Sequence, residues 1–292
     1  MAITWLKIFQ DLSITVMASV KQILFKYPKS MNSHRYLLVL LPMIALSGCI
    51  PPKQAATKPK PTPTLVETTI APGVKMWANR SIKGNPHVIE IDLSKAELRS
   101  LSGKPTPTGK VGQMAFAEFA APNKKKETPQ VMINGTFFQE YNKPTGIAFG
   151  LKQNRQLITY GYGLNEFPDK TMTIAWSQGR ISIDPYSRRT FDGAMPNVVG
   201  VLAATAGKNA DKPLARTFIG TKNLRDDSAY KTVLFFSSES ASQNEAEATL
   251  KEFGAEQVAM LDGGRSTGLM VNGKIIMQPK TQLPQTLGVF IK

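Results

Sequence analysis

Alternating apolar and polar side chains mark much of the chain after residue 73. The clearest stretch is 87–93 (HVIEIDL), in which Ile89 and Ile91 alternate with Glu90 and Asp92. A period of two is the signature of a β-strand with one buried face. Similar or wholly apolar short runs predict further strands at residues 74–77, 130–133, 216–220, 232–236, 257–261 and 287–291.

Hairpins and two helices are predicted to connect these strands. Each hairpin turn holds Asn or Gly, which favour tight turns. The paired segments are residues 146–151 with 156–159, 171–176 with 180–183, and 268–271 with 274–277. Residues 111–121 space Met114, Phe116 and Phe119 as in a helix, and the helix predicted for residues 242–253 ends at Gly254. We therefore predict an α+β fold: a sheet-rich mixed α/β single domain with few helices, over residues 74–292.

The amino-terminal region has the pattern of an export signal. Residues 31–49 read MNSHRYLLVLLPMIALSGC, with a positive start, an apolar stretch too short for a comfortable membrane span, and small residues before Cys49. This matches a bacterial lipobox, so residues 31–48 are predicted to be a signal peptide and Cys49 to carry the lipid. The alternative is an ordinary signal peptide with a chance cysteine. Acylation would tether the protein to a membrane facing the periplasm or the cell exterior.

Two flanking segments complete the domain plan. Residues 1–30 precede a complete signal pattern, so we expect either translation from Met31 or an extended positive n-region. Residues 49–73 are rich in proline and poor in large apolar side chains, which predicts an extended linker.

Charge and rare residues narrow the possible functions. The formal net charge is +15, which favours anionic partners such as phosphorylated glycans, anionic polymers or lipid head groups. The alternative is a generally basic soluble surface without a particular anionic partner. The chain lacks a nucleic-acid motif, so no nucleic acid is predicted. The single cysteine excludes an intramolecular disulfide. If His34 leaves with the signal, only His87 remains, so a multi-histidine zinc site is excluded, and we interpret His87 as a strand-edge residue.

The most informative motif follows the strand at residues 257–261. Asp262 comes first, and Gly263 and Gly264 then allow a tight turn whose N–H groups can face an anion. Arg265, Ser266 and Thr267 follow and complete a candidate substrate-binding turn. The alternative is a purely structural turn capped by the aspartate.

Two other segments carry candidate binding residues. Asn134 and Gly135 end a strand before paired aromatics, where the amide could bind a sugar hydroxyl or a phosphate oxygen. Arg216 opens an apolar strand, where its guanidinium could bind phosphate or form a structural salt bridge. Glu140, shortly after the aromatics, is the candidate second carboxylate, with a solvent-facing loop residue as the alternative.

Taken in order, the segments INGTFF, PTGIAFG, ARTFIG, SQNEAEATLKEFGA and VAMLDGGRSTGLMVNGK resemble the phosphodiester glycosidase domain family. That family includes N-acetylglucosamine-1-phosphodiester alpha-N-acetylglucosaminidase and exported bacterial proteins. The resemblance covers residues 88–292, most clearly 129–273. It implies cleavage of the bond between a sugar's anomeric carbon and a phosphodiester, and it places at the site Asn134, Arg216, Asp262, Gly263, Gly264 and Ser266 or Thr267.

The chain departs from the family pattern at three places. Arg265 stands where a third glycine is common, and Thr136 stands where many members have glycine. Gln285 lies in a segment, residues 283–286, that lacks the arginine expected before the last strand.

Together these features predict an exported hydrolase acting on sugar-phosphate diesters of envelope or extracellular glycans. Asp262 would act as acid, base or nucleophile, Glu140 would assist, and Arg216 and Arg265 would neutralise the phosphate. No cofactor is predicted, although a divalent cation on Asp262 is a second possibility. The alternatives are a non-catalytic lipoprotein that binds glycans or anionic polymers, and a structural envelope protein. The sugar and the oligomeric state stay open.

Overall fold

The computed structural model describes residues 64–121, 127–139, 142–223 and 230–292. The signal peptide, Cys49, most of the linker and Glu140 lie outside these residues. The described part is mostly β, with two short α-helices, α2 (Arg188–Asp192) and α3 (Gln243–Glu252), and two 3-10 turns, η1 (Phe116–Ala120) and η2 (Gly264–Ser266). Among the described residues, none of the helices is both long enough and apolar enough to cross a membrane.

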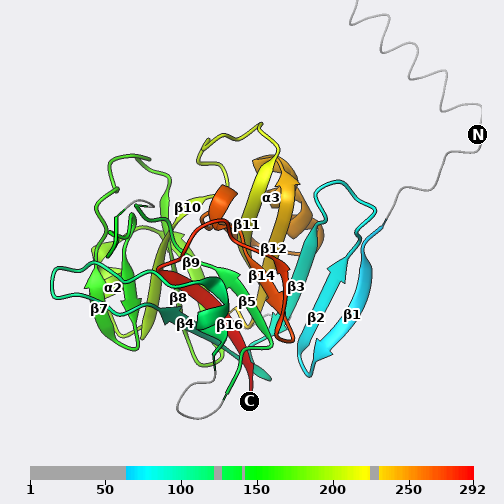
Figure 1. Cartoon of the computed structure of the whole chain (residues 1–292), viewed down its shortest axis with the longest axis horizontal. Coiled ribbons are helices and arrows are strands. Elements are labelled where there is room, and N and C mark those ends of the chain that lie inside the picture. The colour runs from blue at the N-terminus through cyan, green and yellow to red at the C-terminus, as the bar shows by residue number, and fades with distance from the viewer. Residues whose placement is uncertain (1–63, 122–126, 140–141, 224–229) are drawn as a thin grey trace, which may run out of the picture. The chain divides into compact units, whose positions relative to one another are not determined.

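A large antiparallel sheet forms one layer of the domain (Figure 1). Strand β8 (Thr171–Ser177) lies off its main path, pairing with β10 (Asn197–Ala203) and with β9 (Arg180–Pro185). The main path runs β1 (Val66–Ala71), β2 (Val74–Ala78), β3 (His87–Asp92), β12 (Thr232–Ala241), β11 (Leu214–Lys222), β13 (Gln257–Met260), β10 (Asn197–Ala203), β6 (Leu151–Gln153) and β7 (Gln156–Thr159).

A smaller antiparallel sheet packs in front of it in the view of Figure 1. Its order is β15 (Lys274–Met277), β14 (Leu269–Val271), β5 (Val131–Asn134), β16 (Gln285–Ile291) and β4 (Ala96–Ser102). The main hydrophobic core joins the two layers, since it contains Ile219 and Phe235 of the large sheet and Ile133 and Leu287 of the small one. The fold is therefore a sandwich of two sheets held together by apolar burial.

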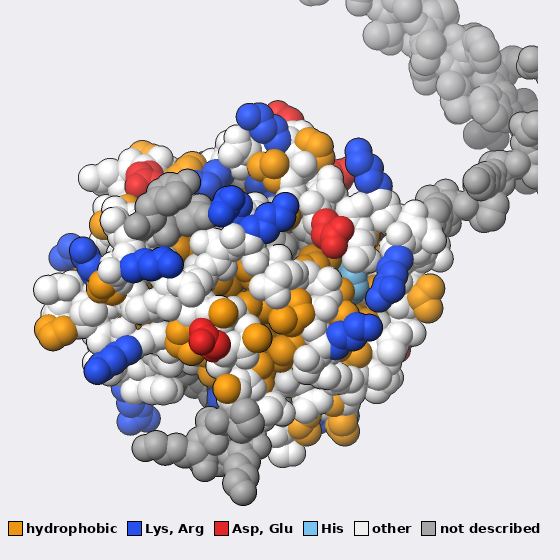
Figure 2. Space-filling view, viewed as in Figure 1, with side chains coloured by type: hydrophobic (Ala, Val, Ile, Leu, Met, Phe, Trp, Pro, Cys, Tyr) orange, Lys and Arg blue, Asp and Glu red, His pale blue; other side chains and the backbone are white. Residues whose placement is uncertain are grey.

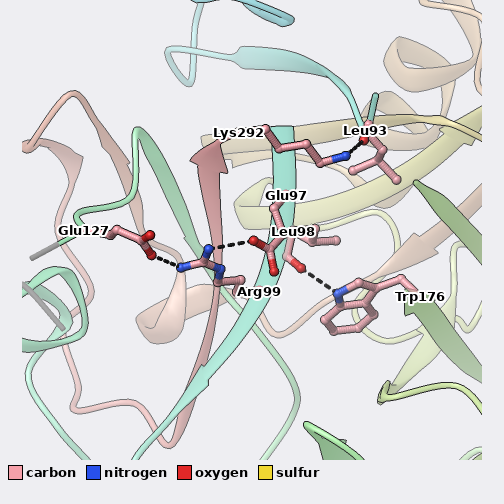
Figure 3. Close-up of polar contacts among 7 residues, drawn as sticks. All are labelled: Leu93, Glu97, Leu98, Arg99, Glu127, Trp176 and Lys292. Carbon is pink, nitrogen blue, oxygen red and sulfur yellow. Dashed lines mark hydrogen bonds and ion pairs between the residues drawn. The ribbon is translucent and has the colours of Figure 1, made fainter. Parts of the chain in front are cut away.

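Polar contacts around β4 help to fix the small sheet (Figure 3). The Trp176 Nε1–H of β8 donates to the carbonyl of Leu98 over 2.8 Å, which links the two layers directly. On the other face of β4, Arg99 contacts Glu97 and Glu127. Because β4 alternates charged and apolar residues and its charges are paired, this polar-looking segment forms a regular strand.

The outer faces of both sheets are also covered. Helix α3 packs Ala246 and Leu250 onto the large sheet, and Ser242 caps it by accepting from the Glu245 N–H at 3.1 Å. Turn η1 packs Phe116 and Phe119 onto Met132 of the small sheet. These layers leave the ends of β5 and β13, with the loops around them, as the place where polar residues converge.

The structure confirms several of the predicted elements. The hairpins at residues 171–183 and 268–277 form as predicted, with Asn272 and Gly273 at positive φ in the β14–β15 turn. The first predicted hairpin also forms, but its first strand is β6 (Leu151–Gln153) and not residues 146–151. Helix α3 ends before Gly254, as predicted. His87 begins β3 as a buried residue, and burial lowers the pKa of its imidazole.

Other predictions are corrected. The sheet-rich fold with few helices is confirmed, but the described residues are mostly β, so the α+β class fits only roughly. The helix predicted for residues 111–121 shrinks to η1, because Val111 instead pairs with Thr145 through backbone hydrogen bonds. Strands β1, β4 and β10 were not predicted, and β1 lies inside the predicted linker, so the sheet begins at Val66.

Candidate functional site

Asn134 joins the ends of two strands that are far apart in the sequence. It is the last residue of β5, it is fully buried, and its Nδ2 donates to the carbonyl of Asp262 over 2.7 Å. Its Oδ1 accepts from the Thr217 hydroxyl at 2.6 Å and from the Gly268 N–H at 3.1 Å. The amide thus holds the chain on both sides of the glycine turn, below the surface. Asn134 is a positioning residue for Asp262 in this geometry, where we expected a direct substrate contact.

Asp262 lies at the start of that turn and is partly exposed. Its N–H donates to the Gly135 carbonyl over 3.0 Å, and its Oδ1 accepts from the Gly263 N–H at 2.9 Å. Gly264 has a φ of +61°, which favours glycine. Asp262 is therefore fixed through both of its backbone polar groups, while its side chain lies at the edge of the glycine turn.

The rest of the predicted turn divides between surface and interior. Gly264 and Arg265 are exposed, whereas Ser266 and Thr267 are each only 5% exposed. Arg265 is braced against Lys280: its Nη2 donates to the Lys280 carbonyl over 3.2 Å, and its own carbonyl accepts from the Lys280 N–H at 2.7 Å. The exposed half of the turn thus offers backbone and a cation, and the two hydroxyl residues lie beneath it.

Arg216 lies next to the turn, but its guanidinium is occupied within the chain. The Arg216 side chain is buried, and desolvation lowers its pKa. Its Nε donates to the Ala241 carbonyl, and its two terminal nitrogens donate to the carbonyls of Lys208, Asn209 and Lys212 and to the sulfur of Met260. A guanidinium has five N–H groups, and these contacts engage all of them. The geometry favours a positioning role for Arg216 over the phosphate contact that we expected.

Gln285 holds the backbone that follows Asn134, and it lies in the segment where the family resemblance implied an arginine. It begins β16 and is 1% exposed. Its Oε1 accepts from the Thr136 N–H at 2.9 Å, and its backbone carbonyl accepts from the Gly135 N–H at 3.2 Å. A Cβ on Gly135 would lie 1.6 Å from that Oε1. Gly135 is therefore required by packing against Gln285, which sequence spacing could not show.

We expect Gly135→Ala to destabilise the protein by about 2 kcal/mol or more, because the new methyl group overlaps the Gln285 amide. Urea unfolding measures this loss. The double variant Gly135→Ala/Gln285→Ala should recover part of it, since the second change removes the overlapping atoms. Gly179→Ala is the control, because a Cβ on Gly179 would meet no other atom within 4 Å. Any loss of stability in that variant would come from the positive φ alone. Strictly additive losses in the double variant would contradict this contact.

Tyr162 lies near enough to Asp262 and Glu166 for both charges to act on its hydroxyl, and it was not predicted. Tyr162 is 49% exposed, and its ring packs over Gly146, where a Cβ would lie 3.2 Å from it. Burial, then the charges of Glu166 and Asp262, raise the pKa of the Tyr162 hydroxyl. Because the charges of both carboxylates affect the Tyr162 hydroxyl, residues 162–166 lie near the glycine turn that begins at Asp262. A half-exposed tyrosine offers a ligand both an apolar ring face and a polar hydroxyl.

Aromatic and basic residues complete the surroundings. Phe137 is buried against Phe149, with ring centroids 5.4 Å apart, so it packs in the core. The Lys208 Nζ stands 5.4 Å from the Phe137 ring centroid and 5.2 Å from that of Phe167. Figure 2 shows one face of the domain, with apolar side chains gathered at its centre and basic side chains around its rim.

Two further observations bear on the chemistry. Within the described ranges, no three His, Cys, Asp or Glu side chains gather as a metal site. A cavity of about 440 Å³ lies away from Asp262, between η1 and the β14–β15 turn, with Ala117, Ala120 and Met270 in its lining. The candidate site rests on the convergence of Asn134, Asp262, Tyr162 and the Lys208 loop, and not on this cavity.

Comparison with known proteins adds a family and a fold. The family model described as phosphodiester glycosidase matches residues 111–290. Among solved structures, zebrafish N-acetylglucosamine-1-phosphodiester alpha-N-acetylglucosaminidase, a catalytic domain auto-inhibited by its pro-peptide, superposes with a TM-score of 0.54 at 14% identity, covering 82% of this chain and 87% of that one. No curated protein sequence matches this chain.

A hypothetical protein from Synechocystis superposes equally well, with a TM-score of 0.54 at 14% identity. The match covers 79% of this chain and 64% of that protein, so the chain spans just under two thirds of its length. At these identities the two structures establish the shared fold alone.

Proposed function

Because the chain belongs to the phosphodiester glycosidase family, we propose that it hydrolyses the bond between the anomeric carbon of a sugar and a phosphodiester oxygen. The observation that carries this proposal is the anchoring of Asp262. Its backbone is held by Asn134 and Gly135, while its carboxylate lies at the edge of the glycine turn. A carboxylate fixed in this way is suited to act as nucleophile or base at an anomeric carbon.

The leaving group explains why cations matter more here than a strong general acid. When the bond between C1 and oxygen breaks, positive charge develops at the sugar ring and the phosphate leaves with the electron pair of that bond. The phosphomonoester that is released has a second pKa of about 6, so it leaves as a stable anion. Arg265 and the exposed backbone of Gly264 lie in the turn that follows Asp262, where they could stabilise that anion.

A second carboxylate would complete a conventional glycosidase pair. Glu140 lies outside the described residues. Within them, Glu166 is the carboxylate that acts with Asp262 on Tyr162, so it is a further candidate for this role. A tyrosine phenol is protonated at neutral pH, and the raised pKa of Tyr162 does not change this, so its hydroxyl can donate a hydrogen bond to the substrate.

The zebrafish relative is named for N-acetylglucosamine-1-phosphodiester, so such a diester is the first substrate that we propose. The sequence of residues 31–49 and the net charge of +15 support an exported, lipid-anchored protein that acts on anionic glycans of the envelope.

The test is turnover by the full chain. UDP-N-acetylglucosamine and an N-acetylglucosamine-1-phosphodiester with a chromogenic alcohol are incubated with the protein, and release of free sugar is measured. We expect hydrolysis of these diesters and none of a neutral chromogenic N-acetylglucosaminide, since the latter offers no phosphate. Binding of the diesters without turnover would instead support the alternative, a non-catalytic glycan-binding lipoprotein.

A further inference from the structure

We propose that Lys208 is the phosphate-binding residue of this site and that Arg216 positions it. The inference rests on the proposed function and names the group that recognises the anionic part of the substrate. Lys208 belongs to the loop between β10 and β11, residues 204–213, which the sequence prediction did not connect with the site.

The first step is the surroundings of the Lys208 ammonium. The side chain is half-buried, and its Nζ stands over the rings of Phe137 and Phe167 at 5.4 and 5.2 Å. Within the part of the chain that the structure describes, no carboxylate forms an ion pair with it. Ring faces hold a cation in place but do not neutralise its charge. The ammonium is thus fixed, partly desolvated, and still able to bind an anion.

The second step is how the chain holds Lys208 there. The Arg216 guanidinium donates to the carbonyls of Lys208 at 3.2 Å, Asn209 at 2.5 Å and Lys212 at 3.2 Å, so one side chain fixes the whole bend. In the described residues these partners are neutral carbonyls, and no carboxylate pairs with Arg216. Arg216 therefore adds a second positive charge directly behind Lys208, which strengthens attraction for an anion.

The third step places Lys208 at the same site as Asp262. Phe137 follows Asn134 by three residues, and Asn134 holds the Asp262 carbonyl. Arg216 contacts both Lys208 and Met260, which precedes Asp262 by two residues. Phe167, the second ring, adjoins Glu166, which acts on Tyr162 together with Asp262. Lys208 and Asp262 thus border the same group of loops, one offering a cation and the other a carboxylate.

Lys152 shows what a structural lysine looks like in this protein. It is 5% exposed, and its Nζ donates to the carbonyls of Phe191 and Gly193, both at 2.7 Å. Its hydrogen bonds are used within the fold. Among the described residues, the Lys208 ammonium contacts ring faces and no carboxylate, which is the arrangement of a ligand-binding cation.

The test uses the full chain and two probes, N-acetylglucosamine 1-phosphate and neutral N-acetylglucosamine, with binding measured by calorimetry. Lys208→Met keeps an apolar stem against the two rings and removes the charge. We expect it to weaken binding of the phosphate probe about tenfold or more, because a charge-assisted hydrogen bond is lost. Lys208→Arg should stay within about threefold of wild type, and wild-type affinity should fall with added salt. Lys212→Met, an exposed lysine of the same loop, is the matched control and should change nothing.

Phosphate binding in Lys208→Met equal to wild type would overturn the inference, and so would a wild type that does not bind the phosphate probe. The two proposals fail separately. Lys208-dependent phosphate binding without any diester hydrolysis contradicts the proposed function alone. Hydrolysis whose KM is unchanged in Lys208→Met contradicts the Lys208 proposal alone.

Discussion

Replacing Asp262 by Asn is expected to lower kcat for a glycosyl phosphodiester by about 10³-fold or more while leaving the fold intact. The amide is nearly the same size as the carboxylate, and its Oδ1 can still accept from the Gly263 N–H, so the turn should persist. It can neither attack the anomeric carbon nor take a proton from water, and that loss is a typical one for a catalytic acid or base. Steady-state release of free sugar measures the effect.

The control for Asp262→Asn is Asp184→Asn, the same chemical change at an exposed position of β9. It should leave kcat within about twofold of wild type, as expected of a surface substitution away from the site. Both variants should unfold at nearly the wild-type temperature. An Asp262→Asn protein that retains most of its activity would remove Asp262 from the mechanism.

Asn134→Ala is expected to have the largest effect on stability, about 3 kcal/mol or more. The substitution leaves the Asp262 carbonyl, the Thr217 hydroxyl and the Gly268 N–H without their shared partner, and each is held at a buried junction of the two sheets. Unpaired buried polar groups cost about 1–3 kcal/mol each, although rearrangement and water recover part of that sum. Denaturant unfolding monitored by tryptophan fluorescence measures the loss.

Asn142→Ala serves as the control for Asn134→Ala, because Asn142 is exposed and its amide donates only to Gln139 in the described residues. Its loss should stay below about 1 kcal/mol. We also expect Asn134→Ala to lose activity under conditions where it is still folded, since the Asp262 backbone is no longer fixed. A folded Asn134→Ala protein with wild-type kcat would show that Asp262 does not need this anchor.

Sequence patterns predicted the elements whose structure is determined locally. The Asn272–Gly273 turn and the Ser242 cap depend on residues that are neighbours in the chain, so their chemistry is visible without the fold. Strand β4 was missed for the opposite reason. Its Arg99 is accommodated by Glu97 and by the distant Glu127, and no local pattern reveals that pairing.

The candidate site shows the same limit. The motifs located Asn134 and Asp262 correctly at strand ends, and the structure brings them into direct contact. Sequence alone could not show that the Arg216 guanidinium donates to the carbonyls of residues 208–212, because those carbonyls approach it only when the loop folds back. Lys208 and Tyr162 were overlooked because neither lies in a motif; their proximity to the site is purely tertiary.

The measurement that tests the central claim most directly is hydrolysis of an N-acetylglucosamine-1-phosphodiester by the full chain in ¹⁸O-labelled water, with both products analysed by mass spectrometry. A glycosidase at Asp262 breaks the bond between C1 and oxygen, so the label must appear in the free sugar and not in the phosphate. Label in the phosphate would mean that the bond between phosphorus and oxygen is cleaved, and it would contradict glycosidic hydrolysis at this site.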